Sequence, residues 1–252
     1  MLKCEQVTFR YGRTGAPVLK GTSLELDQGQ IGIVLGKNGS GKTTLFKNIL
    51  GIHQPKSGSI RFDGENLLKM PRRERARRIA YVPQDIHFGA LSVFDSILMG
   101  RVSYFGLKAS RADYEAVENI LSDMGLSSFA GRNVDELSGG ERQKIAIARA
   151  MAQEPKLMIF DEPTGNLDIA NEQLIIQEAK KLAKQKNISI LSSLHDLNQA
   201  LAFGDKFFFM RDGQVRYSGG PECVNEEVIR DIFDIDVQIL EMNGRKIVLG
   251  GT

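Results

Sequence analysis

The sequence predicts an α/β fold with a mostly parallel sheet that helices cover on both faces. Three short apolar runs support this prediction: Ile31 to Leu35, Leu157 to Phe160 and Ile188 to Leu191. Uninterrupted runs of this length are typical of parallel strands that are buried on both faces. They alternate along the chain with segments of helical character, as expected when helices connect parallel strands.

The composition is ordinary for a water-soluble globular protein. The chain has 252 residues, of which 42% are hydrophobic and 25% charged, enough for one large domain or one domain with a subdomain. A net charge of +2 is too balanced to indicate a nucleic-acid partner by itself. The two cysteines, Cys4 and Cys223, lack any metal-binding spacing, which indicates reduced thiols and a cytosolic setting.

No targeting or membrane segment is expected. The start of the chain reaches Glu5 before any apolar run, which is unlike a signal peptide. A membrane-spanning helix needs about 18 or more consecutive apolar residues, and we find no such run. If the protein works at a membrane, it must therefore dock on a partner that spans it.

The first part of the chain is predicted to contain strands followed by one helix. Val7 and Phe9 alternate with polar neighbours, as in a half-buried strand. The apolar residues Val18 to Leu19 and Leu24 to Leu26 are expected to flank a glycine-containing turn. A helix is predicted from Thr43 to Leu50, ended by Gly51.

The middle of the chain is predicted to be a helical insertion, from about residue 84 to residue 133. Before it, Pro71 is suited to the first turn of a helix that carries five arginines between positions 72 and 78. Within it, Ser110 is suited to cap a helix that ends at Gly125.

The last part of the chain is predicted to return to the α/β core. Helices are expected at 141–153 and 171–185. Asp212-Gly213 and Asn243-Gly244 are typical of two-residue hairpin turns. Between these two hairpins, Asn225 is suited to cap another helix.

The strongest functional motif lies between the strand at 31–35 and the helix at 43–50. Gly36-x4-Gly41-Lys42-Thr43 has the spacing of a phosphate-binding loop, in the strand–loop–helix context that this motif requires. Its glycines let backbone N–H groups turn onto phosphate oxygens, and the helix N-terminus adds partial positive charge. Lys42 is predicted to reach the β- and γ-phosphates and Thr43 to ligate Mg²⁺.

A pair of carboxylates follows the second buried strand. Asp161 is suited to Mg²⁺ coordination in the way that the P-loop fold uses it. Glu162 is suited to act as the general base that polarises the attacking water. Many strands end in an acidic turn, so this pattern is informative only together with the loop at 36–43.

The heptapeptide Leu137-Ser138-Gly139-Gly140-Glu141-Arg142-Gln143 indicates the family. Ser138 and Glu141 have capping-box spacing, so Ser138 can cap a helix whose N–H groups and two glycines face an anion. The run resembles the signature motif of ATP-binding cassette (ABC) ATPases, and the resemblance covers essentially the whole chain. A well-capped helix without this function is the simpler alternative for the Ser-x-x-Glu pattern alone.

The resemblance implies the fold in more detail. It implies a P-loop NTPase of the ABC ATPase type, with a mostly parallel core sheet and an antiparallel β part near the N-terminus. On this basis residues 1–84 and 134–252 are expected to form the core and residues 85–133 a helical subdomain. Residues 220–252 are expected to extend the core by a helix and a hairpin.

Four further positions match motifs of the family. Tyr11 matches the aromatic residue that stacks on adenine, although a strand-end aromatic is often only part of a core. Gln84 matches the Q-loop glutamine that contacts Mg²⁺ or water, and Asp168 lies in the D-loop that crosses between two subunits. His195 matches the switch histidine at the γ-phosphate, although a histidine after a strand is usually structural.

The family's mechanism is implied by the same resemblance. Two copies would dimerise head to tail around two ATP molecules, and hydrolysis would release them. Lys37 departs from the common proline and Thr43 from the commoner serine, but both keep the backbone donors and the hydroxyl. The implied nucleotide contacts are Tyr11, Gly36, Asn38, Gly39, Ser40, Gly41, Lys42, Thr43 and Thr44 of one subunit and Ser138, Gly139, Gly140 and Asp168 of the other; Mg²⁺ ligation is implied for Thr43, Gln84 and Asp161, and a catalytic role for Lys42, Gln84, Glu162 and His195.

The run that begins at the switch histidine resembles the sequence of one subfamily. His195-Asp196-Leu197-Asn198-Gln199-Ala200 resembles the corresponding run in ATPases of iron-siderophore, haem, cobalamin and molybdate importers, as does the segment from Val93 to Arg101. This implies transmembrane permease partners at the cytoplasmic side of the cell membrane and, indirectly, an extracytoplasmic binding protein. A permease helix is expected in a groove around residues 84–99.

Two other classes are weighed against an importer. The D-loop wording Gly165-Asn166-Leu167-Asp168 is also found in export or lipoprotein-release relatives. A soluble ABC ATPase acting on DNA or ribosomes is the other alternative, but a chromosome-type protein needs a long coiled coil and a ribosomal type usually carries two ATPase domains. The arginines at 72–78 are explained more simply as a solvated helix face, so no nucleic-acid partner is expected. The transported substrate is not encoded in this subunit.

Overall fold

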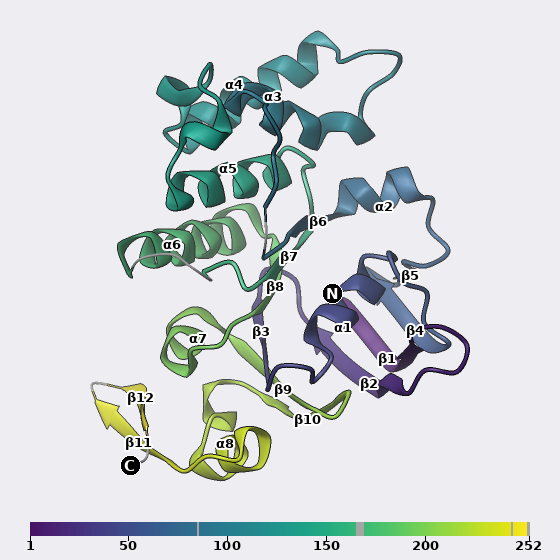
Figure 1. The fold of residues 1–252 in the computed structure, drawn as a ribbon, viewed down its shortest axis with the longest axis vertical. Helices are drawn as coiled ribbons and strands as arrows, with labels where there is room; N and C mark the ends of the chain where they lie inside the picture. Colours follow the sequence, from purple (N-terminus) through teal and green to yellow (C-terminus); the bar gives the residue numbers. More distant parts are fainter. Residues whose placement is uncertain (85, 165–168, 243, 251–252) are drawn as a thin grey trace. The chain divides into compact units, whose positions relative to one another are not determined.

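The chain forms two units in the computed structural model, which describes residues 1–84, 86–164, 169–242 and 244–250. The first unit comprises Met1–Met70 with Lys180–Thr252, and the second comprises Pro71–Ala179. Figure 1 traces the helices and strands along the chain.

An antiparallel sheet begins the first unit. Its order is β2-β1-β4-β5, and β1 is antiparallel to both of its neighbours. Leu2 and Cys4 of β1 are buried and so, after a register shift, are Val7 and Phe9, as expected of a sheet with one face on the core. The strands are β1 (Leu2–Arg10), β2 (Pro17–Leu26), β4 (Ser57–Phe62) and β5 (Glu65–Asn66).

The glycine-containing turn predicted between Val18 and Leu26 is wrong. Gly21 lies inside the continuous strand β2 and has φ 84°, a conformation that other residues adopt at a cost. The pairing with β1 shifts at this point, since Val7 opposes Thr22 while Thr8 opposes Lys20. Gly21 therefore makes a β-bulge, which produces the same glycine signal as a turn without ending the strand.

A second group of strands in the first unit confirms the predicted parallel core. The strand β3 (Ile31–Leu35) is fully buried and pairs in parallel with both β8 (Ser189–Ser193) and β9 (Lys206–Arg211). The hairpin predicted at Asp212-Gly213 joins β9 to β10 (Gln214–Gly219), and both turn residues have positive φ, as a type I′ turn requires. The helix α1 (Lys42–Ile49) follows β3.

The remaining elements of the first unit follow β8 and β10. The cap predicted at Asn225 is confirmed, because its Oδ1 accepts a hydrogen bond from the Val228 N–H at the start of α8. A separate two-stranded antiparallel hairpin comes next; its turn residue Asn243 lies outside the described residues. These elements are α7 (Leu197–Phe203), the 3₁₀ helix η4 (Pro221–Cys223), α8 (Glu226–Phe233), β11 (Val237–Met242) and β12 (Arg245–Gly250).

The second unit is largely helical around one pair of parallel strands. The predicted cap at Ser110 is confirmed as a capping box with Asp113. The helix α6 starts in this unit and continues into the first one. The elements of the second unit are α2 (Arg72–Arg78), β6 (Ile79–Val82), α3 (Val93–Leu98), η1 (Met99–Ser103), α4 (Arg111–Asp123), η2 (Ser127–Phe129), η3 (Val134–Glu136), α5 (Gly139–Met151), β7 (Leu157–Asp161) and α6 (Ile169–Lys186).

Two arginines of helix α2 are hydrogen-bonded to the end of η1 and the residues just after it. Arg73 donates to the carbonyl oxygens of Ser103 and Phe105, at 2.7 and 2.5 Å. Arg77 donates to the same Ser103 carbonyl, and its guanidinium lies 4.3 Å from the centre of the Tyr104 ring. These two arginines therefore satisfy carbonyl groups at and just after the end of η1.

A buried ion pair joins three segments of the second unit. Arg101, only 6% exposed, donates from Nε to Asp113 at 3.1 Å and from Nη1 to Glu154 at 2.5 Å. It also donates to the carbonyl oxygen of Ala152, at 3.1 Å. Burial alone would raise the pKa of Asp113, but hydrogen bonds from Ser110 and Arg101 outweigh it and lower that pKa. The positive charge of Arg101 and the negative charges of Asp113 and Glu154 thus stabilise one another.

No helix in the described ranges is long and apolar enough to cross a membrane. Cys4 and Cys223 are both unbridged, and burial raises the pKa of the Cys4 thiol to about 12.

We expect Arg101→Met to lower the free energy of unfolding by about 3 kcal/mol, because it leaves the buried Asp113 carboxylate without its charged partner. Urea denaturation followed by circular dichroism measures this loss. Arg111→Met is the matched control, since its pair with Glu115 is exposed and should change stability by no more than about 0.5 kcal/mol. Equal losses in the two variants would contradict this account of Arg101.

Candidate functional site

The loop between β3 and α1 follows a path that only glycine permits at several points. Gly36 has φ 155°, and a Cβ there would lie 2.3 Å from the Met210 carbonyl oxygen and 2.9 Å from Ser40 Oγ. Gly39 and Gly41 have φ 82° and 106°. The loop is braced from outside, because the Gly213 N–H donates to the Ser40 carbonyl oxygen at 3.1 Å.

The hydrogen-bonding groups of this loop suit an anion. Gly41 is the N-cap of α1 and provides no side-chain cap for the first turn of the helix. The Ser40 hydroxyl is buried and has no hydrogen-bond partner among the described residues. A helix N-terminus with uncapped N–H groups and a spare hydroxyl donor favours negative charge, so the loop fits a phosphate group.

Lys42 is held against the loop from within. Its side chain is 6% exposed, and Nζ donates to the carbonyl oxygens of Gly36 at 2.7 Å and Lys37 at 3.3 Å. The ammonium group therefore lies beside the turn that the glycines form, where it adds positive charge to the same cradle. Thr43 is exposed beside it.

Lys37, the departure from the family's common proline, points to another element. Its ammonium pairs with Asp234 at the end of α8, and Arg211 approaches the other oxygen of that carboxylate at 3.2 Å. The hydrogen bond from Lys37 is the main reason why the pKa of Asp234 lies below its usual range. The substituted side chain thus tethers the loop instead of occupying the cradle.

Tyr11 is an exposed ring supported by two others. It is 50% exposed and meets Phe9 and His53 edge to face, with ring centres 5.0 and 5.3 Å apart. Its hydroxyl lies 3.2 Å from the Thr44 hydroxyl in α1. The ring is therefore fixed next to the phosphate-loop helix, in keeping with its predicted role as a stacking partner of a base.

His195 lies at the same sheet edge as the phosphate loop. β3 and β8 are parallel, with Val34 opposite Ser193, and each strand ends within one residue of this pair. The loop starts at Gly36, and His195 follows β8 by two residues, so the carboxyl ends of two neighbouring strands supply both. The His195 side chain is exposed.

The second unit gathers the predicted carboxylates and Gln84 in the same way. β6 and β7 are parallel, with Val82 opposite Phe160, so Gln84 and the pair Asp161-Glu162 follow at one edge. Asp161 is 3% exposed and accepts a hydrogen bond from the Tyr81 hydroxyl at 3.3 Å. Burial and then the Asp161 charge raise the pKa of Tyr81 well above its usual value, so this phenol stays a donor.

Glu162 has a strained backbone. Its φ of 52° is in the left-handed region, which glutamate adopts only when its surroundings hold it there. This turn comes immediately after Asp161, the last residue of β7. Neither this conformation nor the Tyr81 contact has a signal in the sequence, because the contact depends on the register of β6 against β7.

The signature segment forms the predicted capped helix start. The Glu141 carboxylate accepts hydrogen bonds from the Ser138 N–H at 2.8 Å and hydroxyl at 2.7 Å, and these bonds lower the pKa of Glu141. Ser138 and Gly139 are exposed at the N-terminus of α5. Gly140 is buried, and a Cβ there would lie 2.2 Å from Oδ1 of Asn171 in α6.

The predicted site residues therefore form two groups. The first unit holds the phosphate loop, Tyr11 and His195, and the second holds Gln84, Asp161 with Glu162, and the signature segment. Asp168 lies outside the described residues. A parallel strand that turns through a glycine loop into an uncapped helix defines a P-loop nucleotide-binding protein.

Comparison with known proteins shows the particular family. The model of the ABC transporter family matches residues 19–165. An ABC transporter ATP-binding protein of Methanocaldococcus jannaschii, itself uncharacterised, is 36% identical over 249 residues, which cover 99% of this chain and 97% of the relative. The chain belongs to the ABC transporter family and has its ATP-hydrolysing cassette.

Two further relatives are named for import. A petrobactin import ATP-binding protein of Bacillus anthracis is 34% identical, covering 94% of this chain and 88% of the relative. A phosphonates import ATP-binding protein of a Synechococcus species is 33% identical, with coverages of 92% and 90%.

Solved structures agree with the family assignment and with the predicted ABC ATPase fold. A structure described as a metal-chelate type ABC transporter in an inward-facing conformation has a TM-score of 0.82 at 30% identity, covering 98% of this chain and 95% of that one. A dimeric ATP-binding cassette in a post-hydrolysis state, bound to ADP and Pi, has a TM-score of 0.75 at 26% identity, with coverages of 88% and 99%.

We expect Lys42→Ala to lower ATP turnover by a factor on the order of a hundred or more, because it removes the cation held inside the phosphate loop. Phosphate release measured at saturating ATP tests this. Lys47→Ala in the last turn of the same helix is the matched control and should keep turnover within about twofold, since the loop does not use that side chain. Undiminished turnover by Lys42→Ala would count against this site.

Proposed function

We propose that the chain is the ATP-hydrolysing subunit of an importer that takes up a metal chelate through a transmembrane permease. The observation that carries the proposal is the phosphate cradle, where uncapped N–H groups, the buried Ser40 hydroxyl and the Lys42 ammonium converge on one loop. Members of the family couple such a cassette to transport. The chain would act at the inner face of the membrane through its permease.

Mg²⁺ fits the oxygen donors that the sequence predicts. Thr43 offers a hydroxyl, Gln84 an amide oxygen and Asp161 a buried carboxylate, and these are the ligand types that Mg²⁺ prefers. When bound with ATP, the ion would supply positive charge against the phosphate oxygens. The Tyr81 hydroxyl, by donating to Asp161, would keep that carboxylate in a fixed orientation.

Glu162 is proposed as the general base. Its left-handed backbone sets it apart from Asp161, so one carboxylate can serve the ion while the other polarises the attacking water. His195 is proposed to contact the γ-phosphate, since it follows β8 at the sheet edge where the phosphate loop follows β3.

The signature segment is proposed to complete the site of a second copy. Ser138 and Gly139 are exposed at the uncovered end of α5, and the capping box fixes their backbone. An exposed helix N-terminus of this kind can receive the phosphates bound by another subunit. The dimeric relative bound to ADP and Pi supports this arrangement.

We expect Glu162→Gln to trap an ATP-dependent dimer, because the amide cannot accept the proton of the attacking water while ATP still joins the two copies. Size-exclusion chromatography with light scattering, with and without ATP, measures the shift from monomer to dimer. Two variants serve as controls. Glu162→Gln with Lys42→Ala should stay monomeric because ATP is not held, and Glu162→Gln with Ser138→Arg should bind ATP without dimerising. A Glu162→Gln protein that stays monomeric with ATP would contradict the proposal that two copies share each ATP site.

The chelate substrate is supported by two likenesses. The run from His195 to Ala200 resembles importers of iron-siderophore, haem, cobalamin and molybdate, and the metal-chelate type structure covers nearly the whole chain. The petrobactin relative agrees with this, whereas the phosphonate relative names a different cargo.

We expect a metal chelate to stimulate ATP hydrolysis by the complete transporter, reconstituted with its permease and binding protein in vesicles. Ferric siderophore, haem, cobalamin and molybdate would be compared with a phosphonate and a polyamine at equal concentration. Stimulation by a phosphonate or a polyamine alone would overturn the chelate assignment and leave the ATPase assignment intact.

The nucleic-acid alternative finds no support in the arginine-rich helix. Arg73 and Arg77 donate to the Ser103 carbonyl at the end of η1, and Arg78 pairs with Glu74 at 2.7 Å. These three arginines therefore have fewer N–H donors left for a phosphate backbone.

A further inference from the structure

The hairpin of β11 and β12 is bound at both of its edges by side chains of two helices. Ile239 and Val248 oppose each other at its middle. In an antiparallel ribbon, alternate pairs direct their N–H and C=O groups outward instead of toward each other. Val248 is such a residue, because its N–H donates to Asn198 Oδ1 at 2.8 Å and its C=O accepts from Asn198 Nδ2 at 2.9 Å.

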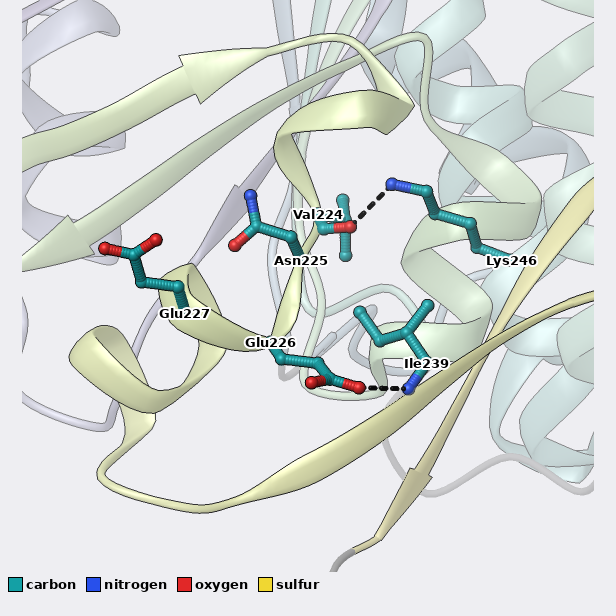
Figure 2. Close-up of a pocket in the computed structure, with 6 residues that line it drawn as sticks. All are labelled: Val224, Asn225, Glu226, Glu227, Ile239 and Lys246. Atoms are coloured by element: carbon teal, nitrogen blue, oxygen red, sulfur yellow. Dashed lines mark hydrogen bonds between the residues drawn. The ribbon is translucent and has the colours of Figure 1, made fainter.

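The other edge of the same pair is bound to α8. The Ile239 N–H donates to the Glu226 carboxylate at 3.0 Å, as Figure 2 shows. Lys246 of β12 donates to the carbonyl oxygens of Val224 at 2.8 Å and Pro221 at 3.0 Å. Val224, Glu226, Ile239 and Lys246 are among the residues that border a hollow of about 420 Å³ between the hairpin and α8. The hairpin is thus bonded to the first residue of α8, to η4 with the residue after it, and to α7 through the Asn198 amide.

Asn198 is placed where it can influence the switch histidine. It lies in the first turn of α7, which Asp196 caps by accepting from the Gln199 N–H at 2.8 Å. His195 is in the short link between β8 and this cap. The β8 end of the link is fixed by pairing with β3, so its other end depends on how α7 is held.

We propose that the β11–β12 hairpin, acting through the Asn198–Val248 contact, is the positioning element that sets the first turn of α7 and with it His195. This inference rests on the proposed function of His195 at the γ-phosphate. Asn198 is a positioning residue, since its amide touches the hairpin and not the reacting atoms. ATP turnover therefore depends on an element that has no part in binding nucleotide.

The chemistry of asparagine explains why this residue type occurs here. Val248 presents a donor and an acceptor side by side, and one planar carboxamide offers the matching acceptor and donor. An aspartate would set a carboxylate oxygen against the Val248 carbonyl, and an alanine would leave both groups without a partner from α7. The asparagine in the His195-Asp196-Leu197-Asn198 run thus gains a structural reason.

The test uses one variant from each side of the contact in the full-length protein. Asn198→Ala removes the amide, and Val248→Pro removes the N–H at an edge position where proline is tolerated. We expect each to lower kcat for ATP hydrolysis about tenfold while KM for ATP stays within about twofold, because misplacement of a catalytic group slows chemistry more than it weakens binding. The double variant should lose no more than the stronger single one.

Histidine NMR gives a second readout that does not depend on turnover. The chain has three histidines, His53, His87 and His195. The imidazole signals of His195, assigned with His195→Ala, should shift or broaden in both variants, while those of His53 stay in place. Leu249→Ala, on the exposed outer side of the same strand, is the matched control and should change neither kcat nor the His195 signals.

Unchanged His195 signals together with unchanged kcat in both variants would overturn the inference, and so would a loss that appears only as a raised KM. Failure of the proposed function has a different signature. If His195→Ala itself hydrolyses ATP at the normal rate, the role of His195 is wrong, whereas the NMR shifts still decide whether the hairpin positions it.

Discussion

The backbone between β3 and α1 can follow its path only because side chains are missing where it turns. At Gly36 a single methyl group would collide with the Met210 carbonyl oxygen and the Ser40 hydroxyl. Because the loop is free of such groups, the first turn of α1 keeps its N–H groups uncapped and Lys42 can fold back inside the loop. The charge, the donors and the shape of the phosphate cradle all depend on this one constraint of backbone geometry.

Parallel pairing then determines which residues gather at the sheet edge within each unit. Parallel strands end at the same edge, so residues that are far apart in sequence meet there without any local signal. In the first unit, His195 and the phosphate loop lie at the same sheet edge. In the second unit, Gln84 lies at the same edge as Asp161 and Glu162. The surrounding elements fix these edges, as Tyr81 does for Asp161 and the Gly213 turn does for Ser40.

Much of this could be predicted from the sequence, because its strongest signals are local. The buried strand at Ile31–Leu35, the cap at Ser138 and the hairpin at Asp212-Gly213 follow from residue types within a few positions, and the structure has all three. The turn predicted around Gly21 is wrong because a β-bulge and a turn both favour a glycine with positive φ. The Asn198–Val248 contact could not be found this way, since it joins residues 50 positions apart and only the register of the hairpin shows which backbone groups face outward.

The middle pair of the β11–β12 hairpin also bears on solubility. The outer face of this ribbon carries Leu240, Met242, Ile247 and Leu249, all exposed. A short apolar ribbon with unsatisfied edges is a template onto which a strand of another molecule can add. Here Asn198 occupies one edge and Glu226 the other, each with a side chain that ends the ladder of hydrogen bonds instead of continuing it. The same contacts that hold the hairpin in place therefore discourage it from seeding intermolecular sheet formation.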